Sequence, residues 1–128
     1  MFDRQMAIVS LAIFAAILAG ASSAAFAHAI VTSSIPAANA SVPAGDVRIV
    51  LTFNSRIDKK RSRIAVLFPD ARETPVPITA DDSENVLQGV ATLNQAGAYQ
   101  IRWQVLSRDG HITRGLIPFS VQPTPPER

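Results

Sequence analysis

Strict alternation of apolar and polar side chains is the feature that most constrains the fold of this chain. In the stretches 47–53, 99–105 and 117–121, every second residue is large and apolar. This period of two is typical of half-buried β-strands, and no later stretch has a convincing helical period. The candidate strands are 28–33, 47–53, 64–68, 86–93, 97–106 and 116–121. Turn-rich clusters separate them, so the pattern predicts an all-β fold: a single Greek-key β-sandwich or barrel of about seven strands.

The N-terminal segment has a different pattern. Arg4 gives a short positive start, residues 6–20 are almost wholly apolar, and small residues lead to Ala25-Phe26-Ala27. This order predicts a cleaved secretory signal peptide at 1–27. An uncleaved membrane anchor is the alternative, but the apolar run of about 15 residues is shorter than the roughly 20 that a spanning helix needs.

Removal of that segment leaves about 100 residues, enough for one domain with a modest core. We expect this domain at 28–122 and a disordered tail at 123–128. The chain has no cysteine, which excludes cysteine nucleophiles, thiolate zinc sites and iron–sulfur clusters. Its net charge of +2 is too small to indicate a nucleic-acid partner.

Two charged clusters have ordinary interpretations. Five of the eight residues at 56–63 (RIDKKRSR) are basic, and we interpret this segment as a solvated turn between strands. The alternative is a docking patch for a partner or for anionic lipid. The acidic DDSE at 81–84 is also interpreted as a solvated turn, because it lacks the ligand spacing of a known Ca²⁺ loop.

The two histidines lie in places that suit metal binding. A cut after Ala27 makes His28 the first residue, and its α-amine and ring Nδ1 can then chelate one ion. A cut after Ala25 leaves an amine-x-His sequence, which also wraps Cu(II) or Ni(II) but in another geometry. His111 follows Asp109 by two positions, and in an extended or bulged segment such side chains point to the same side. The alternatives are a histidine that merely trails a cleavage site and a plain Asp-Gly turn beside a surface histidine.

Considered together, the two histidines favour the metal site. The donors are the α-amine, a ring nitrogen each from His28 and His111, and an Asp109 oxygen. A tetragonal set of three nitrogens and one oxygen favours Cu(II), one ion per chain, whereas zinc more often takes a tetrahedral set. Met1 and Met6 leave with the predicted signal peptide, so no softer ligand remains.

From HAIVTSSIPAANASV through VRIVLTF to GAYQIRWQVLSRDGHITRGLIPFSV, the sequence resembles the CopC family of periplasmic copper-binding proteins. The most specific part is Tyr and Trp on one strand, followed by S-x-D-x-H, Gly and a final F-S-V strand. The resemblance implies a cupredoxin-like, immunoglobulin-like Greek-key β-barrel or sandwich. It implies a Cu(II) site at the amine and ring of His28, with Asp109 and His111, in a periplasmic carrier or buffer that is not an enzyme.

The resemblance also defines where this chain departs from its relatives. Some members have a methionine-rich Cu(I) site, which we do not expect here. Relatives often place an acidic residue after the strand that ends LTF, where this chain has Ser55 or Arg56. Other members are fused to a membrane copper permease. No apolar span follows the domain here, so we expect a monomer that exchanges copper with a separate, CopD-like inner-membrane transporter.

Two other classes of function stay open at this point. Copper oxygenases that cut polysaccharides also use an N-terminal histidine, so a small copper-dependent oxidative enzyme is one alternative. Such enzymes present a broad substrate face, whereas the alternation places Tyr99 and Trp103 in the core. A metal-free secreted structural sandwich is the other alternative.

Overall fold

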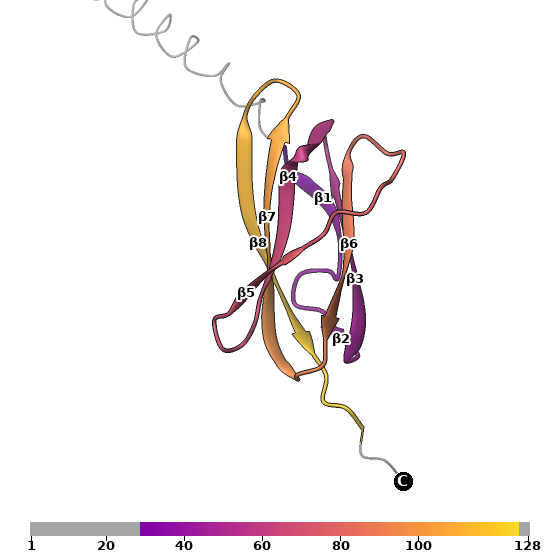
Figure 1. Cartoon of the computed structure of the whole chain (residues 1–128), viewed down its shortest axis with the longest axis vertical. Helices are drawn as coiled ribbons and strands as arrows, with labels where there is room; N and C mark the ends of the chain where they lie inside the picture. The colour runs from indigo at the N-terminus through magenta and orange to yellow at the C-terminus, as the bar shows by residue number, and fades with distance from the viewer. Residues whose placement is uncertain (1–28, 126–128) are drawn as a thin grey trace, which may run out of the picture.

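The computed structural model describes residues 29–125, which form a sandwich of two β-sheets (Figure 1). These residues contain no helix, and so none with the length and apolar character of a membrane span. The predicted signal peptide at 1–27, His28, and residues 126–128 of the predicted tail lie outside the described residues. The predictions about them stay predictions.

Eight strands build the sandwich: β1 (Val31–Ile35), β2 (Ser41–Val42), β3 (Gly45–Phe53), β4 (Ile57–Leu67), β5 (Glu73–Val76), β6 (Val86–Leu93), β7 (Gly97–Ser107) and β8 (Ile112–Val121). One sheet has the order β1-β3-β6, and the other has the order β2-β8-β7-β4-β5. Neighbouring strands are antiparallel, apart from the parallel pair β2 and β8. The predicted all-β sandwich is therefore confirmed.

The core lies between the sheets and contains the apolar rows that the alternation predicted. The inward residues of β3, β7 and β8 are buried: Val47, Ile49, Leu51, Phe53, Tyr99, Ile101, Trp103, Val105, Ile117, Phe119 and Val121. Trp103 and Phe53 meet edge to face across the two sheets, with ring centroids 5.3 Å apart. Such aromatic contacts add to the free energy gained by burying the rings themselves.

The interpretation of the basic segment 56–63 as a turn is wrong, because most of it lies in β4. The pairing of β4 with β7 is interrupted between Asp58 and Arg63, so the strand bulges there. Inside the bulge the buried Ser62 hydroxyl donates to the carbonyl of Asp58 at 2.6 Å and accepts the Leu106 N–H at 3.1 Å. These bonds replace the lost ladder bonds. The basic side chains around Ser62 can then stay in solvent.

Strand β8 begins at Ile112, earlier than the predicted start at residue 116. Its first inward positions are Thr113 and Gly115, which are not large apolar residues. The alternation of apolar and polar side chains is therefore missing from this part of the strand. Gly115 faces the Trp103 ring so closely that a Cβ atom would lie 2.4 Å from ring atom Cζ2. The missing side chain at Gly115 is thus what makes room for the indole.

Candidate metal centre

The turn between β7 and β8 carries Asp109 and His111. The last strand pair before it is Leu106 with Ile112. The Gly110 N–H donates to the Ser107 carbonyl at 2.9 Å, and the Ser107 N–H donates to the His111 carbonyl at 2.9 Å. Gly110 has φ of +90°, a conformation that favours glycine. The segment is therefore the Asp-Gly turn of the alternative interpretation and not an extended or bulged segment.

This turn nevertheless brings the Asp109 and His111 side chains into contact. Asp109 Oδ1 accepts the His111 backbone N–H at 3.3 Å, and Asp109 Oδ2 lies 3.2 Å from His111 Nδ1. The backbone hydrogen bond from His111 is the main reason that the pKa of Asp109 lies below its usual value. A neutral imidazole that donates from Nδ1 presents the lone pair of Nε2 to a metal, so the contact would orient the ring as a ligand.

The start of the described chain is fixed at the end of β3. Ala29 is buried in the core. The Ile30 N–H donates to Asn54 Oδ1 at 2.8 Å, and the Asn54 N–H donates to the Ile30 carbonyl at 2.9 Å. These two bonds hold residues 29 and 30 against the loop that joins β3 to β4.

The same loop also contacts the β7–β8 turn. The Arg108 N–H donates to the Arg56 carbonyl at 3.4 Å, and the next residue, Ile57, pairs with Ser107. Figure 1 shows the β7–β8 turn, the start of β1 and the loop before β6 at one end of the sandwich. The loop 54–56 thus brings the start of the described chain close to Asp109 and His111.

Glu84, the last residue of the acidic segment 81–84 that we interpreted as a solvated turn, lies at this end. Its carboxylate contacts Arg56 Nε at 2.8 Å and Arg108 Nη2 at 3.3 Å. Arg56 is, with Ser55, one of the two residues near the place where relatives often have an acidic residue. The structure puts the negative charge on a different loop and against that arginine. The sequence contains no local signal of this contact, because Glu84 and the two arginines come from three separate loops.

Among residues 29–125, no third His, Cys, Asp or Glu side chain joins Asp109 and His111 as a potential metal ligand. No group of three His, Cys, Asp or Glu side chains that could hold a metal occurs in that range. Two hydroxyl groups next to the turn, those of Ser107 and Thr113, are buried and lack a hydrogen-bond partner among the described residues. Buried polar atoms normally have a partner. This end of the sandwich therefore contains buried polar atoms whose hydrogen bonds the described residues do not supply.

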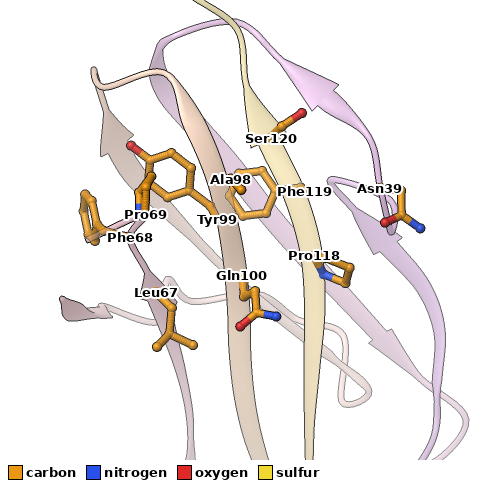
Figure 2. Close-up of a pocket in the computed structure, with 10 residues that line it drawn as sticks. All are labelled: Asn39, Leu67, Phe68, Pro69, Ala98, Tyr99, Gln100, Pro118, Phe119 and Ser120. Carbon is orange, nitrogen blue, oxygen red and sulfur yellow. The ribbon is translucent and has the colours of Figure 1, made fainter. Parts of the chain in front are cut away.

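A hollow of about 410 Å³ lies at the opposite end of β7 from Asp109 and His111 (Figure 2). Tyr99 and Phe119 stack beside it with ring centroids 5.6 Å apart. The Tyr99 hydroxyl donates to the Gln95 carbonyl at 2.6 Å, and burial raises the pKa of Tyr99. No carboxylate or imidazole lines this hollow. It offers no metal ligands of the predicted kind, so Asp109 and His111 remain the better candidates.

Comparison with known proteins gives this geometry a context. The family model of the CopC domain matches residues 31–122. The chain belongs to the CopC family. The CopC match spans all eight strands and contains Asp109 and His111, whereas His28 precedes it.

Individual proteins are also similar to this chain. Protein YobA of Escherichia coli (strain K12) is 32% identical over 100 residues, which cover 76% of this chain and 81% of YobA. The crystal structure of CopC from Methylosinus trichosporium OB3b has a TM-score of 0.70 at 25% identity, covering 79% of this chain and all of that one.

PcoC, a methionine-rich copper resistance protein from Escherichia coli, has a TM-score of 0.59 at 25% identity and covers 75% of this chain and 100% of its own. This CopC-family chain has only two methionines, Met1 and Met6, both within the predicted signal peptide. It therefore differs from PcoC in its supply of soft sulfur ligands.

Proposed function

We propose that this protein is a periplasmic Cu(II) carrier or buffer that binds one ion at the end of the sandwich that carries Asp109 and His111. The ligands are the α-amine and ring of His28, with Asp109 and His111. CopC-family membership supports copper as the ion, and it supports a binding protein and not an enzyme. The observation that carries the proposal is the Asp109–His111 contact beside the anchored start of the described chain.

The chemistry of the donor set favours the divalent ion. Three nitrogens and a carboxylate suit a tetragonal Cu(II) site. Sulfur ligands, which stabilise Cu(I), are missing from residues 28–128. The bound ion should therefore resist reduction, and we propose that it is exchanged with a separate membrane transporter.

The intact mass of the exported protein, with and without one equivalent of Cu(II), tests this proposal. We expect a chain that begins at His28 and keeps one copper ion against a weak chelator. Copper adds a fixed mass, so native mass spectrometry reports the cut and the stoichiometry together. A different first residue, or a correct start without retained copper, would contradict the proposed site.

Copper affinity should fall in acid because of the nitrogen donors and not because of Asp109. The folded-state pKa of Asp109 lies below its usual 3.8, so this carboxylate stays ionised at pH 5. Its own contribution to stability is complete above the usual value and disappears only as the pH falls through the lower, folded one. Imidazoles have reference pKa values of about 6.5 and must lose a proton to bind. Chelator competition between pH 7.5 and 4.5 should therefore show a marked loss below about pH 6. Undiminished affinity at pH 4.5 would contradict nitrogen ligation.

Glu84→Gln should weaken Cu(II) binding by up to about tenfold, because it removes a negative charge at the end of the sandwich that carries the proposed site. The carboxylate pairs with both Arg56 and Arg108 and offsets one of their two positive charges. Its loss leaves two cations near a dication, which like-charge repulsion disfavours. Exposed ion pairs contribute about 1 kcal/mol or less, so urea unfolding should change little.

The matched control is Glu73→Gln. This variant also removes an exposed carboxylate that is paired with an arginine, since Glu73 Oε2 lies 3.1 Å from Arg102 Nη1. Unlike Glu84, Glu73 lies on the outer face of the five-stranded sheet. Copper affinity should be unchanged in this variant. Equal weakening in both variants would mean that overall charge, and not the position of Glu84, sets the affinity.

A further inference from the structure

The outer face of the five-stranded sheet carries charged side chains that the proposed copper site does not use. The strand register aligns six outward residues in two rows across β4, β7 and β8: Arg63, Gln104 and Arg114, then Ala65, Arg102 and Leu116. With Glu73 of β5 they line a groove of about 670 Å³, here called the arginine groove. The inward neighbours of these residues form the core, so the groove is a surface of the folded domain.

Positive charge in the arginine groove exceeds its negative charge. Arg102 is paired with Glu73, whose two oxygens lie 3.2 and 3.1 Å from Nη1. Arg114 Nε donates to the neutral Gln104 Oε1 at 2.8 Å. The Arg63 guanidinium has no ion pair or hydrogen bond with another described residue. Two guanidinium groups therefore lack a carboxylate within residues 29–125, and an anionic ligand would be attracted to them.

The groove also offers apolar contact. Leu116 is 50% exposed, and Ala65 is partly exposed in the same row, on the other side of Arg102. Arginine and apolar side chains together are typical of the central parts of protein interfaces. The complementary partner is a segment with carboxylates and at least one aliphatic side chain.

This surface continues to the candidate metal centre. The outward residues of β8 run from Leu116 through Arg114 to Ile112, which is 54% exposed and directly follows His111. Leu106 pairs with Ile112 on the same face. Figure 1 shows β7 and β8 running side by side up to their turn. A segment that lies along the groove would therefore end next to Asp109 and His111.

We propose that the arginine groove docks an acidic, partly apolar segment of the protein with which this chain exchanges copper. The inference rests on the proposed function for the identity of that partner, but the docking itself does not need the metal. A protein segment fits better than an anionic membrane, because the arginines line a hollow on the side of the sandwich. The two lysines of the sequence, Lys59 and Lys60, lie in the bulged part of β4 outside this groove.

A synthetic peptide of alternating Glu and Leu residues is the probe, and its counterpart with Gln in place of Glu is the neutral control. Titration of the ¹⁵N-labelled, copper-free protein should show saturable shifts in β4, β7 and β8 with the acidic peptide only. Arg114→Glu and Arg63→Glu should each weaken binding by at least about tenfold, through repulsion of the carboxylates. Arg63→Ala is the milder variant and should weaken it less.

The other sheet provides a matched control. Arg48 on β3 also reaches a glutamine across the strands, with Nη2 3.4 Å from Gln88 Oε1. Arg48→Glu makes the same charge change on the opposite face and should leave peptide binding unchanged. Glu73→Gln should tighten binding, because it releases Arg102 for the ligand.

Several results would overturn the docking proposal. One is that the neutral peptide binds as tightly as the acidic peptide, and another is that Arg48→Glu weakens binding as much as Arg114→Glu. A third is that the groove signals shift with protein concentration when no peptide is present, which would indicate a second copy of this chain as the occupant. If the protein bound phosphatidylglycerol vesicles but not the peptide, and Arg114→Glu abolished the vesicle binding, the groove would be a membrane-binding surface. Copper retention by Arg114→Glu, measured by native mass, should equal that of the wild type. Peptide titration therefore tests the docking proposal, and native mass spectrometry separately tests the copper-site proposal.

Discussion

His111→Ala is expected to lower Cu(II) affinity by more than about 100-fold, because it removes a ligand and not only a group that supports one. The fold should survive, since the His111 side chain is 52% exposed and lies in a turn. The variant keeps the backbone N–H that is the main cause of the lowered pKa of Asp109, so the carboxylate stays ionised. Competition with a chromophoric chelator at pH 7.5 measures the loss.

Asp109→Asn is the companion variant. An amide oxygen can still accept the His111 N–H, so the turn should persist while the charge is removed. We expect a smaller loss of affinity than in His111→Ala, with the same melting temperature in both variants. Unchanged affinity in His111→Ala would exclude His111 from the site, and a melting temperature lowered only in that variant would attribute the loss to the turn.

Trp103→Ala is expected to lower the free energy of unfolding by about 3–5 kcal/mol, the usual cost of deleting a buried aromatic side chain. The indole is 7% exposed, packs edge to face on Phe53 and fills the space left by Gly115. Its deletion removes a contact between the two sheets and leaves a cavity. Urea unfolding followed by far-ultraviolet circular dichroism measures the change.

Two variants frame this result. Gly115→Ala keeps the indole but places a Cβ against it, and should lower stability by about 1–3 kcal/mol through overpacking. Gln104→Ala changes the outward neighbour of Trp103 and should change stability by about 0.5 kcal/mol or less. A loss below about 1 kcal/mol in Trp103→Ala would show that the indole is not a central core residue.

The sequence predicts the fold where large apolar side chains mark every inward position. This holds for residues 47–53 of β3 and 99–105 of β7, whose inward rows are all buried as expected. It fails where a small or polar residue points inward, as Ser62 does in the bulge of β4 and Gly115 does beneath Trp103. In both cases the reason is a partner from another strand, which a single stretch of sequence does not contain.

In the candidate site too, contacts within one segment could be predicted from the sequence and contacts between segments could not. The spacing of Asp109 and His111 predicts that they lie together, and they do, although the segment is a turn and not a strand. Their binding of copper with His28 stays a proposal. The position of Glu84 between Arg56 and Arg108 depends on three loops that meet at one end of the sandwich. No spacing within one segment could have predicted that contact.

The parallel pairing of β2 with β8 has a consequence for when this protein folds. Ser41 pairs with Ser120, near the opposite end of the described chain. Pairings between such distant segments form slowly, because a long loop must close before any contact repays the lost entropy. The β7–β8 turn also needs β8, since Leu106 pairs with Ile112. A growing polypeptide thus lacks the sheet edge and the donor turn until almost all of it has been synthesised. Such late closure would suit the export that we propose for this protein, because an unfolded chain could leave the compartment in which it is made before it folds.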